Sequence, residues 1–198
     1  MIPNSNLYRN GLAVNVNYSL LDNLKISTNI NYVRSKSNDM PATGNRASNP
    51  LQAVYNYSNV NVLDLQNYWV PGQENLQQLQ VATGKDNPYF LAYELTNAFN
   101  RDRIFGNIKL DWEINEHFTA FLRAAETNSV EKRETKIPYS YSRDLKGGYH
   151  LQDLQNREDN IDFLFTYNSL DKIPDFNYSV STGGNYMSQF NTETYPAS

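Results

Sequence analysis

Two carboxylates stand close together in one polar stretch of the chain, where Asp111 and Glu113 are two residues apart. Glycosidases use paired carboxylates as acid and nucleophile or base, when the pair flanks a sugar ring at a set separation. Residues i and i+2 of a strand point to one face, and no second carboxylate pair of suitable geometry accompanies these two. The pattern does not indicate hydrolysis, and we expect no enzymatic activity.

Residue types that bind metals are sparse. Cysteine is absent, and His117 and His150 lie in an expected turn and an expected loop without neighbouring ligands. An acidic cluster offers the oxygen ligands that calcium prefers, but its spacing lacks the regular pattern of a calcium loop. We expect neither a metal nor a cofactor. The acidic cluster comprises Asp153, Glu158, Asp159 and Asp162.

Composition narrows the class of protein. The chain has 198 residues, of which 39% are hydrophobic, and a formal net charge of -4. Charges of both signs are scattered without a basic stripe, so we expect no nucleic-acid partner. No window approaches the roughly 18 to 20 consecutive apolar residues that a membrane helix needs. Only alternating strands could therefore carry this chain through a membrane.

Strict alternation of apolar and polar residues is the strongest signal in the sequence. Within residues 9–20, Leu12 and Val14 fall on one face of an extended strand, and Asn15 and Asn17 fall on the other. One face suits lipid and the other suits water, as in an outer-membrane β-barrel. We predict an all-β, antiparallel up-and-down barrel segment of three hairpins, with strands near 9–20, 24–36, 101–114, 117–129, 159–169 and 175–188.

The polar face of these strands carries most of the charges. A packed core would not accept Lys109, Asp111 and Glu113 without partners, whereas a water-filled lumen would. The sequence leaves open which face of residues 117–129 is lipid-facing, because the face with the charged Arg123 also carries the apolar Phe121. We expect the lumen residues to be solvated or to pair across strands, with contact to a plug or a solute as the alternative. The predicted lumen-facing residues are Asn15, Asn17, Asn29, Asn31, Asn107, Lys109, Asp111, Glu113 and Arg123.

Connections alternate between short and long. Short turns are expected near 21–23, 115–116 and 169–175, and long loops near 37–100 and 130–158. Outer-membrane barrels place short turns on the periplasmic side and long loops outside, and a girdle of aromatic residues marks the interface. The pairs Asn49-Pro50 and Asn87-Pro88 predict starts of short helices, and 73–81 is a weaker helical candidate. The expected girdle comprises Tyr18, Trp112, Phe118, Tyr167, Phe176 and Tyr178.

Three runs in the middle of the chain form a specific pattern: Asp86-Asn87-Pro88-Tyr89, Glu94-Leu95-Thr96-Asn97 and the block from Asn100 to Asp111. This pattern resembles the barrel of SusC/RagA-family TonB-dependent outer-membrane transporters. The stretches 24–34, 147–149 and 160–168 look like the same family. The resemblance therefore covers most of the chain.

The resemblance implies a 22-stranded barrel in the outer-membrane lipid, of which residues 1–198 are a six-stranded piece without the plug domain. Such transporters import oligosaccharides or peptides with a SusD-like surface lipoprotein as lid. TonB supplies energy through a segment ahead of the plug. The start, Met1-Ile2-Pro3-Asn4, lacks the pattern of a secretory signal, so we expect an internal piece of a larger protein.

Aromatic residues in the long loop are candidates for contact with a solute or a lid protein: Tyr68, Trp69, Tyr89 and Tyr93. Their rings could stack on sugars, but large aromatic side chains more often pack, here by folding the loop onto the barrel rim. Two other architectures stay open. A soluble β-sandwich that binds glycan would bury Leu12 and Val14 in its core. A small complete barrel would need at least eight strands, with extra strands hidden in 52–65.

Overall fold

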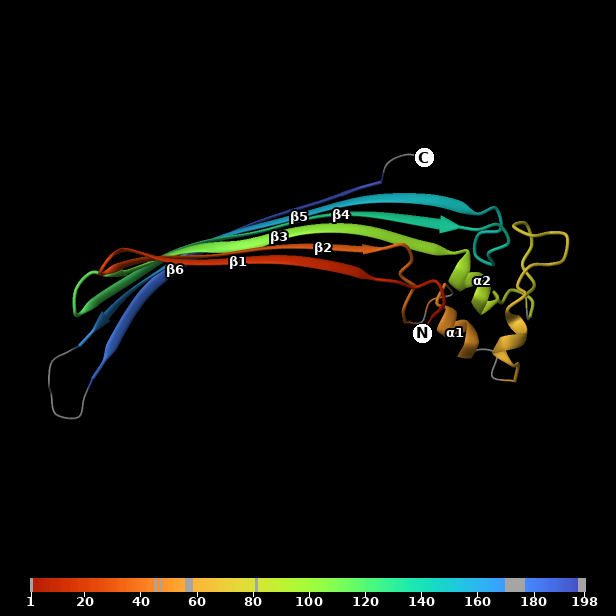
Figure 1. Ribbon diagram of the computed structural model, residues 1–198, viewed down its shortest axis with the longest axis horizontal. Coiled ribbons are helices and arrows are strands. Elements are labelled where there is room, and N and C mark those ends of the chain that lie inside the picture. Colours follow the sequence, from red (N-terminus) through yellow and green to blue (C-terminus); the bar gives the residue numbers. More distant parts are fainter. Residues whose placement is uncertain are drawn as a thin grey trace.

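The computed structural model describes residues 2–44, 46, 48–55, 59–80, 82–169 and 177–195. The described chain forms one six-stranded antiparallel sheet in which each strand pairs with the next along the sequence (Figure 1). This confirms the predicted all-β, up-and-down fold class. The strands are β1 (Tyr8–Leu21), β2 (Leu24–Ser37), β3 (Thr96–Glu113), β4 (Phe118–Ile137), β5 (Gly148–Asn168) and β6 (Ser179–Thr194).

Short turns join the strands at one end of the sheet. β1 and β2 pair as far as Leu21 opposite Leu24, so Asp22 and Asn23 make the turn. Between β3 and β4 the side-chain oxygen of Asn115 accepts hydrogen bonds from the backbone N–H groups of His117 at 2.9 Å and Phe118 at 3.0 Å. Asparagine favours turns because its side chain replaces a missing backbone partner in this way. The predicted turn at 169–175, and Phe176 of the expected girdle, lie almost wholly outside the described residues.

Three strands are longer than predicted. β3 begins at Thr96, β4 runs on to Ile137 and β5 begins at Gly148, so the predicted loop at 130–158 was wrong and only 138–147 connect these strands. The added segments carry polar residues on both faces, which removes the alternation that predicts a strand. Their backbone ladder nevertheless continues from Val130 opposite Gln155 to Ile137 opposite Gly148.

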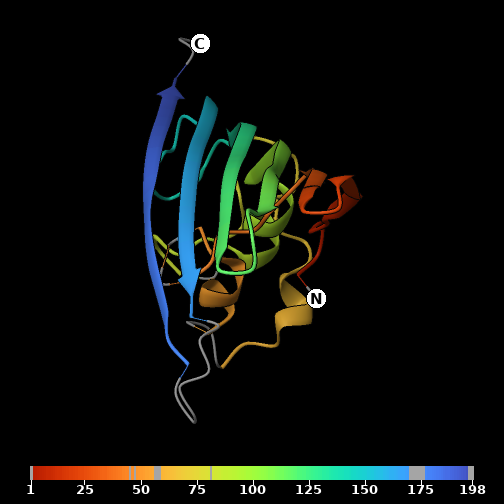
Figure 2. The same cartoon turned by 90° about the vertical axis from the view of Figure 1, so that its left-hand side faces the viewer.

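The register places apolar side chains together on one face, which we call the apolar face. Residues directly opposite each other on neighbouring strands share a face of the sheet, and we call such a row of residues across the strands a rung. Two rungs that run through all six strands define the apolar face. Leu12, Ile108 and Phe163 on this face are 65%, 54% and 53% exposed, because no second layer of the described chain covers them (Figure 2). The predicted β-sandwich alternative is therefore wrong. The rungs are Val16, Thr28, Ile108, Ala124, Ile161 and Tyr186, and Tyr18, Ile26, Leu110, Leu122, Phe163 and Gly184.

The buried core of the described chain lies in the long connection between β2 and β3, at the end of the sheet away from the short turns (Figure 1). It contains helix α1 (Pro50–Tyr55), the 3-10 helix η1 (Val62–Leu65) and helix α2 (Pro88–Tyr93). Phe90 is fully buried there, among Ala53, Leu91, Leu95 and Tyr141. Because Tyr141 comes from the β4–β5 connection, the two long connections share one core.

Both predicted helix starts are confirmed. The side chain of Asn49 accepts from the backbone N–H of Leu51 at 3.0 Å, and that of Asn87 accepts from Tyr89 at 2.9 Å, so each asparagine caps the helix that its following proline begins. No described helix is long and apolar enough to cross a membrane.

Two weaker predictions about the loop are wrong. Residues 73–80 form turns, not a helix, because Gln78 pairs with Trp69 in an isolated bridge and buries its side chain; Val81 lies outside the described residues. The strands suggested within 52–65 are absent from the described part of that segment, where α1 and η1 occupy the chain instead. The eight strands of a small complete barrel are thus not present in the described ranges.

Candidate functional site

The second face of the sheet, which we call the polar face, collects every residue predicted to face a lumen. Asn15 lies opposite Asn29, which lies opposite Asn107; further along, Lys109 lies opposite Arg123. This register also settles the facing of β4: Phe121 and Arg123 are on the polar face and Leu122 is on the apolar face. That the polar face lines a lumen stays a prediction.

Asparagines occupy the middle of the polar face. Asn29 donates from its side-chain amide to the side-chain oxygen of Asn15, and Asn31 donates in the same way to Asn29. Asn107 and Asn160 continue the same rung across β3 and β5. An amide carries both donor and acceptor groups without charge. The middle of this face is therefore neutral and able to exchange hydrogen bonds with water or a polar solute.

Charged residues near the short turns pair with one another. The Lys25 Nζ lies 3.6 Å from a Glu113 carboxylate oxygen, and the Lys109 Nζ lies 2.6 Å from an Asp111 oxygen. These exposed pairs contribute little to stability, because water screens them. Asp111 and Glu113, the carboxylates two residues apart, thus each have a lysine partner.

The pair on β4 and β5 is closer and better aligned. The Arg123 guanidinium donates to one oxygen of Asp162 at 3.0 Å from Nε and 2.7 Å from Nη2. Lys109 Nζ also lies 4.8 Å from the centre of the Phe121 ring, within the range of a cation–π contact. Positive and negative charges therefore balance at this end of the polar face.

Arginines occupy the other end of the polar face, beside the long loops. Arg101 lies opposite Glu131, and Arg103 lies two residues further along β3 on the same face. Sequence reasoning missed Glu131 and Arg133, because it assigned residues beyond 129 to a loop. The sequence did offer one indication of this end of the face, because Arg101 and Arg103 continue the odd-numbered positions that are polar along β3.

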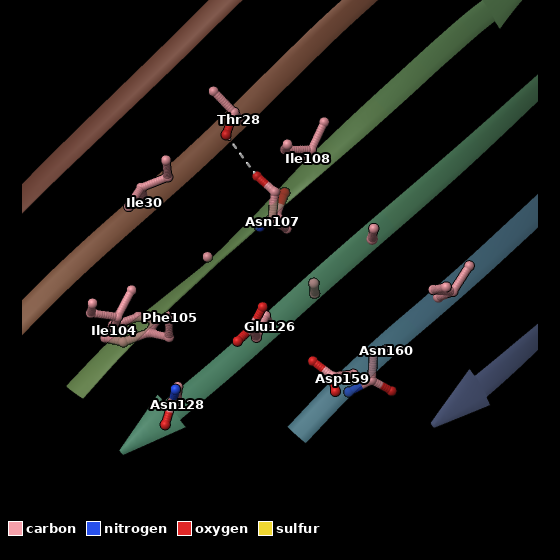
Figure 3. A pocket seen from close by; sticks show the side chains of 14 residues that line it. Thr28, Ile30, Ile104, Phe105, Asn107, Ile108, Glu126, Asn128, Asp159 and Asn160 are labelled. Atoms are coloured by element: carbon pink, nitrogen blue, oxygen red, sulfur yellow. Dashed lines mark hydrogen bonds between the residues drawn. The ribbon is translucent and has the colours of Figure 1, made fainter. Parts of the chain in front are cut away.

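A hollow of about 560 Å³ lies over the apolar face, with Ile30, Ile104 and Ile108 among its lining residues (Figure 3). Gly106 and Ala124 also line it. A Cβ at Gly106 would lie 2.1 Å from the backbone oxygen of Asn29, so only glycine fits this close approach of β3 to β2. Beside it Thr28 donates from its hydroxyl to the backbone oxygen of Asn107 at 3.0 Å (Figure 3). The hollow belongs to the apolar face, with isoleucines at its walls.

The structure brings the four loop aromatics together. The Tyr68 ring stacks on Tyr93 at a centroid distance of 6.1 Å, and Tyr93 stacks on Tyr89 at 6.5 Å. Trp69 meets the buried Phe90 edge to face at 5.5 Å. Burial and the 2.7 Å hydrogen bond to Glu94 raise the pKa of Tyr68. These rings fold the loop, and their contact with a solute or a lid stays a prediction.

A buried polar network joins the two long connections. Gln78 donates from its side-chain amide to Asp86 and to the backbone oxygen of Ser140, both at 2.6 Å, and accepts from the backbone N–H of Asn87 at 3.0 Å. Ser142 donates to Asp86 from its backbone N–H at 2.9 Å and from its hydroxyl at 2.5 Å. Buried polar groups need such partners, so the network ties the loops in one arrangement.

The acidic cluster does not converge. Asp153 and Asp159 point to the apolar side of β5, while Glu158 and Asp162 point to the polar side, because neighbouring residues of a strand alternate. Among the described residues, no group of three or more histidines and carboxylates could hold a metal ion.

Comparisons with solved structures give a likeness in fold. No protein-family profile and no curated protein matches the sequence. A solved structure, "Structure of the RagAB peptide importer in the 'closed-closed' state", matches with a TM-score of 0.60 at 14% sequence identity. The match covers 96% of this chain and 22% of that chain. The likeness shows that this chain shares the fold of a part of that structure, which is far longer.

Proposed function

We propose that this chain is part of the wall of an outer-membrane importer of the SusC/RagA type. The observation that carries the proposal is the two-faced single sheet, in which rungs toward the short turns are apolar and exposed on one face and polar on the other across all six strands. A single layer of this kind is stable only if something other than the chain covers its apolar side. Lipid is the covering that fits an exposed apolar belt whose residues alternate along each strand with polar residues on the opposite face.

The dimensions of the apolar belt support a bilayer crossing. On β3 the belt runs from Ile104 to Trp112, close to the roughly 9 to 11 residues that a membrane strand needs. The belt ends earlier on β4 and β5, because Glu126 and Asp159 lie in the same rung as Gly106. Such an oblique belt is expected when strands tilt relative to the membrane.

Aromatic rings at the short-turn end support the proposed orientation. Phe118 lies 5.1 Å from Tyr167, and Tyr167 lies 6.0 Å from Tyr178, measured between ring centroids. Trp112 is in the last complete rung of this end. Aromatic rings gather at membrane interfaces because one end of each is apolar and the other tolerates water. The short turns would then be periplasmic and the shared loop core extracellular.

Passage of a solute, not chemistry, is the proposed activity. The polar face offers amides and balanced ion pairs to a hydrated solute, and the extracellular loops offer a folded surface. The matching solved structure is that of a peptide importer, which favours peptide over oligosaccharide as the solute. A SusD-like lipoprotein on the loops, a plug in the lumen and TonB as the energy source complete the proposal.

Membrane fractionation followed by an uptake assay tests the proposal. The full-length protein should sediment with the outer membrane, migrate faster on gels before boiling than after, and support uptake of a fluorescent oligopeptide. An otherwise identical strain without the protein is the control. A protein recovered without detergent, or uptake that does not differ from the control strain, would contradict the proposal.

A further inference from the structure

Aromatic and arginine side chains alternate down the polar face of β3 at its loop end. Phe99, Arg101, Arg103 and Phe105 occupy successive positions of that face, because they differ by two residues along one strand. Arg133 of β4 lies opposite Phe99. We call these five residues the arginine strip. The strip begins beside Ile104, the last apolar rung of β3, and continues toward the loops.

One carboxylate already lies within the strip. Glu131 is 3.9 Å from the Arg101 guanidinium and 2.5 Å from that of Arg133. The side chain of Glu131 is only 12% exposed, whereas those of Arg101 and Arg133 are 43% and 50% exposed. Glu193 of β6 is a second carboxylate in the rung of Arg101 and Glu131, so Arg101 and Arg133 have acidic neighbours although their side chains are about half exposed.

Arg103 has no acidic neighbour in the described part of the chain within 4.0 Å. Its register partners are Val33 on β2 and Ser129 on β4, which are uncharged. Its guanidinium instead lies 4.8 Å from the centre of the Phe105 ring. An arginine held on an aromatic face keeps its donor edges free, and it is ordered before a ligand arrives.

The charge contrasts with the other end of the same face. Over the loop half of that face, the register groups four arginines with three glutamates, which leaves one positive charge in excess: Arg9, Arg101, Arg103 and Arg133, and Glu131, Glu158 and Glu193. Near the short turns, Lys25, Lys109 and Arg123 each have a carboxylate partner. We therefore expect the polar face to attract anions at its loop end and not to bind them near the short turns, where each cation is already paired.

We propose that the arginine strip binds carboxylate groups of the transported solute, so that the protein prefers acidic solutes to neutral ones. The planar guanidinium matches a carboxylate with two parallel hydrogen bonds, and the phenylalanine rings pack against the carbon chain that carries it. The inference rests on the proposed importer function and names the solute class. The carboxylate has two sources, an acidic peptide or an acidic oligosaccharide.

Binding to the purified full-length protein in detergent tests the inference. The probes are triglutamate, triglutamine and a trigalacturonate of similar length. We expect triglutamate to bind more tightly than triglutamine, and Arg103→Gln to weaken triglutamate binding by about tenfold or more while leaving triglutamine unchanged. Arg103→Lys should retain part of the preference for triglutamate, because lysine keeps the positive charge but cannot donate two parallel hydrogen bonds to a carboxylate.

Arg34→Gln is the matched control, since Arg34 lies on the apolar side of β2, in a rung next to that of Arg103, and pairs with Asp102 at 3.8 Å. Equal weakening by Arg34→Gln and Arg103→Gln, or equal affinity of the parent for both tripeptides, would overturn the inference. Tighter binding of trigalacturonate than of triglutamate would assign the carboxylate to oligosaccharides. If neither acidic probe binds a protein that inserts in the membrane, only this inference fails; if the protein does not insert, the importer proposal fails as well.

Discussion

The sheet and the loop cluster of this protein are held together in opposite ways. The sheet has exposed side chains on both faces and its cohesion comes from backbone ladders. The loop cluster has the buried core around Phe90 and a buried hydrogen-bond network around Gln78. The difference indicates that the sheet depends on its surroundings, whereas the loops carry their own hydrophobic core.

The largest effect is expected at the loop core. Phe90→Ala removes a fully buried ring, and the cavity together with the lost burial should cost about 3 to 5 kcal/mol. The loops should become sensitive to protease in intact cells, while the strands stay inserted. Tyr55→Ala, at an exposed position of α1, is the control. Loss of membrane insertion together with the loops would show that the two regions are not independent.

A charge on the apolar face should have the next largest effect. Ile108→Arg places a guanidinium in a complete apolar rung, which in a bilayer should cost about 2 to 4 kcal/mol. Asn107→Arg, one residue away on the polar face, should cost far less, because water reaches it. Unfolding in lipid vesicles by denaturant measures both variants. Similar costs for the two would contradict the assignment of the faces.

A smaller effect is expected in the buried network. Gln78→Ala removes one of the donors to Asp86 and leaves the backbone N–H of Asn87 and the backbone oxygen of Ser140 without this side-chain partner, at a cost of about 1 to 3 kcal/mol. Hydrogen exchange in 82–95 and 138–147 should accelerate together, since the network joins the two connections. Gln73→Ala, at an exposed turn residue, should leave both unchanged. Acceleration of one connection alone would refute a shared network.

The smallest effect concerns Asp39, at the end of β2. Burial raises the pKa of its carboxyl, although the side chain accepts from the backbone N–H of Asn97 at 2.9 Å. The folded state therefore binds a proton more readily than the unfolded chain. The stabilisation by this proton is complete below the ordinary value of 3.8 and is lost as the pH rises through the raised folded value.

Asp39→Asn keeps the acceptor oxygen and removes the charge. At about pH 8 the variant should be more stable than the parent by no more than about 1 kcal/mol, and at about pH 3.5 the difference should vanish. Thermal unfolding of the loops between about pH 3.5 and about pH 8 measures this difference in stability, and Asp22→Asn in the exposed turn is the control. A variant that is less stable than the parent at about pH 8 would contradict a cost for burying this charge.

Sequence reasoning reached the sheet through the alternation of residues 9–36 and 103–114, because one face of each strand is apolar. It failed where both faces are polar: Glu131, Arg133 and Gln152 lie in regular strands that carry no periodic signal. The helix starts were predictable from local chemistry at Asn49 and Asn87. The network of Gln78 was not, because its partners Asp86 and Ser140 are distant in sequence and meet only in the fold.

The residues of the polar face were predicted only from the alternation of polar and apolar positions. The register places these residues, from Asn15 on β1 to Arg123 on β4, on one face of the sheet. Their pairings needed coordinates, since a cross-strand partner such as Asp162 for Arg123 depends on register. The aromatic cluster around Tyr68 likewise needed the loop fold, because Tyr93 is the last residue of α2 and several turns lie between Tyr68 and that helix.

Accessibility of spin labels along β3 tests the central claim most directly. Labels placed one at a time at residues 104–112 of the full-length protein in lipid vesicles are probed with oxygen, which concentrates in lipid, and with a water-soluble nickel chelate. The account predicts a period of two, with even-numbered positions reached by oxygen and odd-numbered positions reached by nickel. Labels at even-numbered positions reached by nickel, or shielded from both probes, would contradict it.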